Sequence, residues 1–132
     1  MEKLEHIGIA VRNMDQSNAL FASILGVAHY KIEEVVSEGV RTSFFDIGGV
    51  KIELLEALHK DSPIAKYIEK KGEGIHHLAF SVPDISESIQ SYKEKGFEVI
   101  NEIPKKGADE KVICFLHPKS TGGVLIELCQ DV

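Results

Sequence analysis

The segment GGVKIELLE at residues 48–56 is repeated almost unchanged as GGVLIELCQ at residues 122–130. A second pair of similar segments lies upstream, with LEHIGIAV at residues 4–11 and IHHLAFSV at residues 75–82. The two pairs follow each other in the same order in each half of the chain. Internal similarity of this kind is typical of a repeated supersecondary unit. The sequence therefore indicates two tandem modules.

The spacing between matching residues supports the duplication. His6 precedes Glu53 by 47 residues, and His77 precedes Glu127 by 50. Each histidine stands in the upstream segment of its half, and each glutamate stands in the downstream segment. The four residues therefore occupy equivalent positions in the two halves.

Each half carries one helix signal after its histidine. We expect Asp15 and Asp84 to be N-caps, because an aspartate side chain accepts a hydrogen bond from the first free amides of a helix. We expect Gly26 and Gly96 to follow the last helical residues, since glycine readily adopts the left-handed conformation found there. A third helix is expected over residues 62–71, where a serine and a proline precede the apolar positions.

The remaining segments of each half are rich in residues that favour strands. The strands expected after the helices span residues 27–36, 40–47 and 50–57 in the first half, and 97–103, 111–117 and 124–129 in the second. With the histidine-bearing strand in front, each half follows the order β-α-β-β-β. The predicted fold class is α+β, in a single domain over residues 1–132. It comprises module 1 at about residues 1–60, a linker helix at 61–72 and module 2 at about 73–132.

Composition excludes several classes of function. The chain has 132 residues and a net charge of −6, with 15 Lys and Arg against 21 Asp and Glu. A nucleic-acid-binding domain needs a basic face that displaces counterions from phosphates, so we expect no nucleic-acid partner. No run of about 18 apolar residues predicts a membrane span, and no signal-peptide pattern is present. The expectation is a soluble, cytoplasmic protein.

Strand alternation predicts where the histidines point. Successive side chains of a strand lie on opposite faces, so His6 shares a face with Gly8, and His77 shares a face with Ala79. Bulky apolar residues occupy the other face of both strands. Small neighbours leave room for a ligand beside each histidine. The adjacent His76 points to the other side, so His77 is the counterpart of His6.

The two glutamates indicate a metal site. Glu53 and Glu127 alternate with large apolar residues, and a carboxylate in such a strand is costly to bury unless it is paired or bound to a metal. A single strand histidine or glutamate is more often structural than a ligand, but here both recur at matching places. We therefore expect His6, Glu53, His77 and Glu127 to bind one divalent cation. Imidazole and carboxylate donors suit Co, Mn, Ni, Zn, Fe or Mg.

Taken together, these features resemble the vicinal-oxygen-chelate superfamily, which includes glyoxalase I, extradiol dioxygenases and methylmalonyl-CoA epimerase. The segments KIELLEAL, DSPIAKYIEKKGEGIHHLAFSV and FLHPKSTGGVLIEL are most similar to the epimerases. The resemblance implies a fold in which the two β-α-β-β-β modules form an open, cup-shaped mixed sheet around a metal cavity.

The same resemblance implies an activity, the interconversion of the (R) and (S) forms of 2-methylmalonyl-CoA. The carboxylate and the thioester carbonyl of the substrate would chelate the metal, and the cation would stabilise the enolate that forms when the C2 proton leaves. By similarity, Glu127 would be both a metal ligand and the catalytic base, with His6, Glu53 and His77 as the other ligands. The implied partners are a CoA thioester and a second copy of the chain, because similar proteins are often homodimers.

Two positions depart from the pattern of similar epimerases. Some of these proteins carry a second base, a glutamate, three residues after the glycine that corresponds to Gly39, whereas this chain has Thr42 there. Many carry Gly-Ala-His-Gly before the penultimate strand, whereas this chain has Asp109 in place of the histidine. Both departures permit a divergent substrate.

A cluster of lysines near the last two strands suits the phosphates of coenzyme A. Lys105 and Lys106 precede the penultimate strand, and Lys119 follows it. The expected substrate-binding residues are Lys106, Lys119 and Ser120, because charged and polar donors bind phosphate oxygens strongly. A solvated lysine-rich face is the alternative interpretation.

Two other functions stay open from the sequence. Glyoxalase I would use the same ligands and the same enolate chemistry on the hemithioacetal of methylglyoxal and a small thiol. A non-catalytic small-molecule-binding module, as in antibiotic-resistance relatives, is the third possibility. Modules of that kind commonly lack the four ligands, which counts against it.

Overall fold

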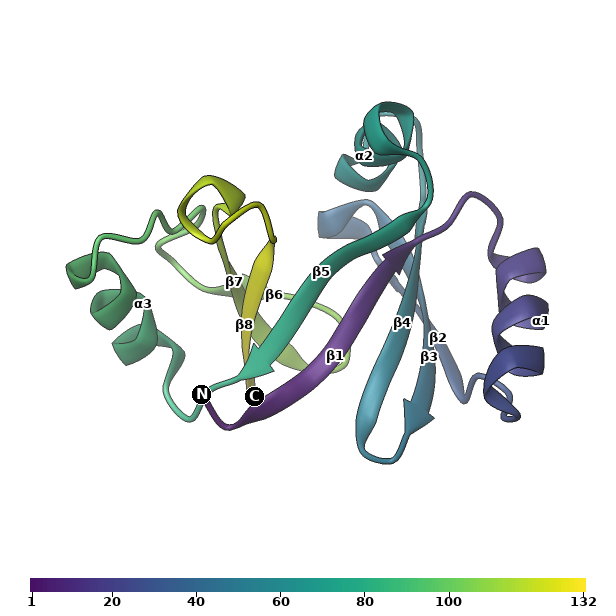
Figure 1. The fold of residues 1–132 in the computed structure, drawn as a ribbon, viewed down its shortest axis with the longest axis horizontal. Helices are drawn as coiled ribbons and strands as arrows, with labels where there is room; N and C mark the ends of the chain where they lie inside the picture. Colours follow the sequence, from purple (N-terminus) through teal and green to yellow (C-terminus); the bar gives the residue numbers. More distant parts are fainter. The chain divides into compact units, whose positions relative to one another are not determined.

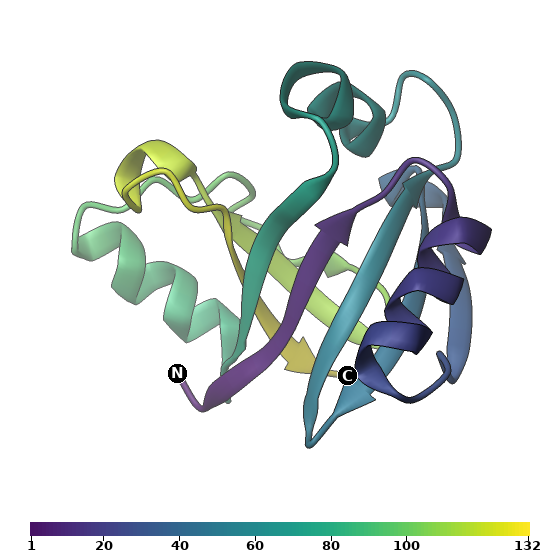
Figure 2. The same cartoon turned by 45° about the vertical axis from the view of Figure 1, so that its right-hand side comes forward.

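The computed structural model describes residues 1–132 (Figure 1, Figure 2). The chain divides into two units. Unit 1 comprises residues 1–5 and 77–132, and unit 2 comprises residues 6–76. The elements in chain order are β1 (Lys3–Ala10), α1 (Met14–Leu25), β2 (Lys31–Val35), the 3-10 helix η1 (Val36–Glu38), β3 (Val40–Ile47), β4 (Val50–Ala57), α2 (Pro63–Lys71), β5 (Gly74–Ser81), α3 (Ile85–Glu94), β6 (Lys105–Lys106), β7 (Lys111–Leu116), the 3-10 helix η2 (Pro118–Ser120) and β8 (Ile126–Asp131). Each half follows the predicted order β-α-β-β-β, and α2 lies between the halves in the sequence.

The strands form a mixed sheet with the hydrogen-bonded order β2-β3-β4-β1-β5-β8-β7-β6. The β1–β4 and β5–β8 pairs are parallel, and the other pairs with a defined register are antiparallel. Strand β1 contributes to both units. In unit 2 it pairs with β4 from His6 to Ala10, whereas in unit 1 the preceding Glu2 amide donates to the Ser81 carbonyl at 2.8 Å. The predicted α+β class and the paired modules are confirmed.

In unit 2, the sheet buries apolar side chains on both faces. Met14, Phe45 and Leu54 form a core with the inner side of α1 on one face. Leu55 packs against Ile64 of α2 on the other. Because Leu54 and Leu55 are consecutive in β4, the strand alternates between the two cores. Glu53 shares the face of Leu55, on the side away from α1.

Unit 1 has the same organisation. Ile89 of α3 packs against Leu128 of β8 on one face of the sheet. Ala79, Ile113 and Cys129 pack together on the other face. Glu127 precedes Leu128, so its side chain leaves β8 on the face of Cys129, away from α3.

The first helix begins at Met14, two residues earlier than an Asp15 cap would place it. Asn13 is the N-cap, and its side-chain oxygen accepts a hydrogen bond from the Gln16 amide at 3.0 Å. Asp15 lies inside the first turn instead. The prediction of an Asp15 cap is therefore wrong, because asparagine caps a helix as well as aspartate does and stands at the position where the chain is still extended. The Asp84 cap of α3 is confirmed, with a 3.0 Å bond from the Glu87 amide.

The strand expected over residues 97–103 is also wrong. That segment forms only an isolated bridge between Val99 and Leu116, and the strand beside β7 is the short β6. The Asn101 side chain explains the interruption, because it donates to the Ile113 carbonyl at 3.2 Å and accepts from the Phe115 amide at 3.1 Å. A side-chain amide that bonds to the backbone in this way replaces the ladder bonds of a regular strand.

The helix predicted over residues 62–71 is confirmed as α2. Ser62 caps α2 by accepting a hydrogen bond from the Ala65 amide at 3.2 Å, Pro63 is the first helical residue, and Gly72 follows the last with a φ of 80°. None of the three α-helices has both the length and the apolar character needed to cross a membrane.

The cap correction predicts a difference in stability between two neighbouring variants. Asn13→Ala should lower the free energy of unfolding by about 1 kcal/mol, because the first amides of α1 lose their acceptor. Asp15→Ala should cost less than about 0.5 kcal/mol, since only a charge near the helix N-terminus is lost. Urea unfolding of both variants measures the difference. An Asp15 variant less stable than the Asn13 variant would contradict the assignment.

Candidate metal centre

In unit 2, His6 and Glu53 form a buried pair. The Nδ1 atom of His6 lies 3.1 Å from Oε2 of Glu53, and each residue is 4% exposed. The two come from adjacent parallel strands, and Gly8 of β1 is the register partner of Glu53. With no side chain at Gly8, the space beside the Glu53 carboxylate stays open to the imidazole that lies two residues earlier.

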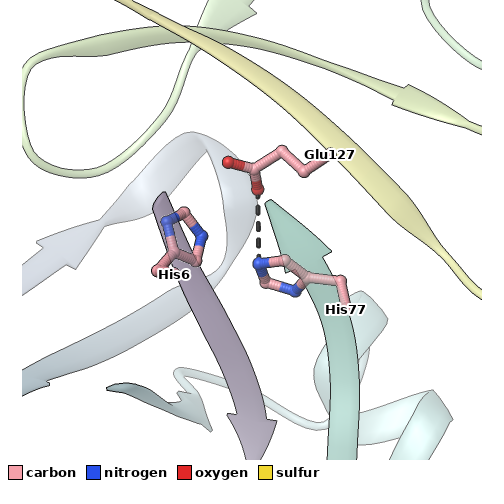
Figure 3. A group of neighbouring side chains, drawn as sticks. All are labelled: His6, His77 and Glu127. Atoms are coloured by element: carbon pink, nitrogen blue, oxygen red, sulfur yellow. Dashed lines mark ion pairs between the residues drawn. The ribbon is translucent and has the colours of Figure 1, made fainter. Parts of the chain in front are cut away.

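In unit 1, His77 and Glu127 form the equivalent pair. Nε2 of His77 lies 3.4 Å from Oε1 of Glu127, and each residue is 5% exposed. Figure 3 shows this ion pair between β5 and β8 and also draws His6, which belongs to unit 2. Ala79 is the register partner of Glu127 on one side, and Phe115 is its partner on the other.

The two pairs are built by the same backbone register. In each unit the histidine lies two residues before the small residue that faces the glutamate across a parallel pair, Gly8 in unit 2 and Ala79 in unit 1. Parallel strands hold such positions at a constant spacing. The duplication read in the sequence therefore extends to the register of the sheet. The predicted small-residue face beside each histidine is confirmed.

The repeated segments in β4 and β8 also hold the module helices, a role that the sequence patterns did not predict. The Met14 amide, at the start of α1, donates to Oε2 of Glu56 at 2.8 Å. The Ile85 amide, at the start of α3, donates to Oε1 of Gln130 at 2.7 Å. Glu56 and Gln130 are the last residues of the repeated segments 48–56 and 122–130, three residues after Glu53 and Glu127. The repeated segment thus carries both a candidate ligand and an acceptor for the following module helix.

His76 has a different environment from His77. Its ring lies edge-on to the Tyr67 ring, with 4.8 Å between the centroids. Burial lowers the pKa of His76 to about 4, so this imidazole is uncharged at neutral pH. The Tyr67 hydroxyl donates to the Ile75 carbonyl at 2.8 Å. His76 therefore packs against α2, as expected for a residue pointing away from the side of His77.

The two positions that depart from the epimerase pattern lie in ordered backbone. Thr42 is 1% exposed in β3, in register between Glu33 and Leu55. Asp109 lies in the turn before β7 with a φ of 61°, a left-handed conformation that aspartate tolerates better than most residues.

Two of the expected substrate-binding residues line one surface pocket. Lys119 and Ser120 border a pocket of about 540 Å³ together with Lys95, Phe97 and Glu98. The Lys119 ammonium lies 2.8 Å from Oε1 of Glu98, and this hydrogen bond holds the pKa of the Glu98 carboxyl below its usual range. Lys106 is not among the residues that border the pocket and pairs with Val112 in β6–β7.

The donor set fits a divalent cation. In each unit, the pair offers one buried imidazole and one buried carboxylate. Nitrogen and oxygen donors suit Zn, Co, Ni, Mn and Fe, and carboxylates extend the range to Mg. The two cysteines, Cys114 and Cys129, are buried strand residues and do not belong to this donor set.

The pattern of residues 5–115 matches the model of the glyoxalase/bleomycin resistance protein/dioxygenase superfamily. The chain belongs to this superfamily. Over 97% of its length it is 38% identical to the mitochondrial methylmalonyl-CoA epimerase of Homo sapiens, of which it covers 73%. It is also 41% identical to the uncharacterised protein YqjC of Bacillus subtilis, with 98% of this chain and 93% of that protein covered.

The fold comparison agrees with the sequence relatives. The Streptomyces coelicolor methylmalonyl-CoA epimerase, solved in complex with 2-nitronate-propionyl-CoA, superimposes with a TM-score of 0.95 at 33% identity. The alignment covers the whole of this chain and 96% of that one. The resemblance read from the repeated segments is confirmed, and members of this superfamily with closely similar sequences include methylmalonyl-CoA epimerases.

The buried thiol of Cys114 in unit 1 should be inert. Burial, with a smaller contribution from the Glu127 charge, raises the pKa of Cys114 to about 12. Since the thiolate is the reactive form, we expect iodoacetamide at pH 8 to modify Cys114 at least about 100-fold more slowly in the native protein than in urea. Peptide mass spectrometry measures both rates. Rapid native labelling of Cys114 would contradict the burial of its thiol.

Proposed function

We propose that this protein is a divalent-metal-dependent epimerase that interconverts (R)- and (S)-methylmalonyl-CoA. The observation that carries the proposal is the duplicated buried pair, His6–Glu53 in unit 2 and His77–Glu127 in unit 1. It occurs in a chain that aligns over almost its whole length with methylmalonyl-CoA epimerases. Buried imidazole and carboxylate groups are costly unless they are paired or bind a ligand, and these four are donors that suit a divalent cation.

In this proposal, His6, Glu53, His77 and Glu127 hold one divalent cation. When bound, the cation would withdraw charge from the acyl group and lower the energy of its enolate form. The small residues Gly8 and Ala79, which face the two glutamates in register, leave volume beside the donors. The apolar cores behind the donors exclude water from the opposite face of the sheet.

Glu127 is the proposed base. Its carboxylate would accept the proton from C2 of the acyl group, and the electron pair of the broken C–H bond would pass into the enolate. Delivery of a proton from solvent to the opposite face of C2 would then yield the other epimer, and return of the proton from Glu127 to the same face would regenerate the starting one. The 3.4 Å contact with His77 orients this carboxylate.

Exchange of the C2 proton with solvent tests both the metal and the base. With methylmalonyl-CoA in D2O, we expect deuterium to enter C2, the rate to fall after treatment with a chelator, and a divalent metal to restore it. Glu127→Gln should lower the exchange rate by about 100-fold or more even at saturating metal, as expected for loss of a general base. Nuclear magnetic resonance measures the exchange.

Glu53→Gln is the matched control, because Glu53 is the equivalent glutamate of the other module. It should weaken metal binding, measured by elemental analysis after dialysis, and excess metal should recover most of its exchange rate. Equal losses of metal and activity in Glu127→Gln would remove the case for a base at this position. No exchange in any metal form, together with turnover of the hemithioacetal of methylglyoxal and glutathione, would assign the glyoxalase I alternative.

The CoA part of the substrate is proposed to contact the pocket bordered by Lys119 and Ser120. Both residues lie in η2, the 3-10 helix between β7 and β8, and Glu127 follows near the start of β8. The pocket volume of about 540 Å³ lies within the range of small-molecule sites. A substrate contact for Lys106 stays a prediction.

A charge-neutral variant tests this contact. Lys119→Gln should raise the KM for methylmalonyl-CoA by roughly three- to tenfold and leave kcat unchanged, because an exposed lysine contributes modestly to binding and takes no part in the proton transfer. Steady-state kinetics at low salt measures both constants. An unchanged KM would show that the phosphates bind elsewhere.

A further inference from the structure

The two modules differ in length at one connection. In unit 2, Leu54 follows its antiparallel partner Ser43 by 11 residues. In unit 1, the equivalent Leu128 follows its partner Cys114 by 14 residues. The histidine-to-glutamate spacings of 47 and 50 residues differ by the same three residues. The additional residues of unit 1 therefore lie in the connection between β7 and β8, which contains η2.

The longer connection of unit 1 forms an ordered turn. In unit 2 the connection is short, and the Asp46 side chain accepts a hydrogen bond from the Gly49 amide at 3.0 Å. In unit 1, Nδ1 of His117 accepts a hydrogen bond from the Lys119 amide at 3.1 Å, and the Ser120 hydroxyl donates to the His117 carbonyl at 2.9 Å. These bonds hold the backbone of Lys119 and Ser120 within the lengthened connection.

The segment after α3 forms the other wall of the pocket that Lys119 and Ser120 border. The Glu98 amide donates to the Ser120 hydroxyl oxygen at 3.2 Å, and the His117 amide donates to the Glu98 carbonyl at 2.8 Å. Phe97 also borders the pocket, beside Glu98. Two hydrogen bonds thus join the walls, so the backbone sets the distance between them.

The Glu98 carboxylate binds the Lys119 ammonium inside this pocket. Oε1 of Glu98 lies 2.8 Å from Nζ of Lys119, and Oε2 lies 4.0 Å from Nε2 of His117. The hydrogen bond from Lys119 lowers the pKa of Glu98, so the carboxylate is charged at neutral pH. The other lysine of the pocket, Lys95, lies 5.4 Å from the centroid of the Tyr92 ring. An anion that binds the Lys119 ammonium must therefore compete with a carboxylate.

We propose that this pocket binds the 3′-phosphate of coenzyme A and that the phosphate displaces Glu98 from Lys119. This inference rests on the proposed function and names the part of the substrate that the pocket recognises. A phosphate monoester carries a charge of about −1.5 to −2 at neutral pH. The Glu98 carboxylate and each phosphate of the diphosphate linkage carry about −1. Only the monoester therefore gains Coulomb attraction when it replaces the carboxylate beside the ammonium.

The binding of two ligands that differ by the 3′-phosphate tests the proposal. We expect the original protein to bind CoA at least about threefold more tightly than dephospho-CoA, as for a charge contact at an exposed site. Glu98→Gln should strengthen CoA binding by roughly two- to fivefold, because the ammonium loses its competing carboxylate. The same variant should change dephospho-CoA binding by less than about 1.5-fold. Isothermal calorimetry at low salt measures these affinities, since salt screens exposed charges.

Glu102→Gln is the matched control, because Glu102 is another exposed glutamate of unit 1 in an ion pair with a lysine, Lys93, and it does not border the pocket. This variant removes the same charge and should change CoA binding by less than about 1.5-fold. Lys119→Gln should reduce the preference for CoA over dephospho-CoA to less than about 1.5-fold. Urea unfolding of all three variants verifies that none loses its fold.

The outcomes separate this inference from the proposed function. Weaker or unchanged CoA binding in Glu98→Gln would show that the carboxylate does not compete with the phosphate, and equal gains for CoA and dephospho-CoA would assign the pocket to the diphosphate. Each result would overturn the inference. Equal affinity of the original protein for both ligands would overturn it as well, while C2 exchange of methylmalonyl-CoA would leave the proposed function standing. If the original protein binds neither ligand and exchanges no C2 protons with any divalent metal, both proposals fail together.

Discussion

The placement of two carboxylates inside a sheet is the constraint on which the rest of the structure depends. Glu53 and Glu127 each lie in a strand whose neighbouring residues enter an apolar core. Such a carboxylate is tolerated only with a partner, because burial of an unpaired charge costs several kcal/mol. Each has a histidine within 3.1 to 3.4 Å, supplied by the adjacent parallel strand. The pairing therefore offsets part of the cost of burying each carboxylate.

Parallel pairing imposes the chain order of each module. Two parallel neighbours cannot be joined by a tight turn and need a crossover connection, which here consists of a helix and further strands in both halves. The crossover must return with the correct register, or the glutamate would face the apolar core. Glu56 and Gln130 link the end of this path to its beginning, because each accepts a hydrogen bond from the first residue of its module helix. The strand with the glutamate therefore also positions the helix that follows the histidine.

Sequence patterns predicted those parts of the fold where one short-range signal dominates. The duplication and the faces of His6 and His77 follow from alternation within single strands, and the α2 boundaries follow from a serine, a proline and a glycine. The errors arose where two signals competed. Asn13 and Asp15 are both good caps, and only the point at which the chain leaves its extended conformation decides between them. Asn101 interrupts an otherwise strand-like segment through bonds to a strand more than ten residues away, which no local pattern contains.

The candidate site shows the same division between local and long-range information. The four repeated residues were identified from spacing, since duplication preserves spacing. The helix acceptors Glu56 and Gln130 were present in the same repeats, but their role depends on a helix more than 40 residues earlier. Which of the consecutive residues Lys105 and Lys106 shares a face with Glu127 depends on the register of β6 on β7, which no local sequence pattern contains.

The shortness of β6 has a consequence for the charge on the face of the sheet that carries Glu127. The strand is two residues long and lies at the end of the sheet order, so it contributes little to the stability of β7 and β8. A slip of one residue in its pairing would place Lys106 instead of Lys105 on the face of Glu127. Because both residues of β6 are lysines, either register leaves one ammonium on each face, and the preceding loop can change in length without changing that charge.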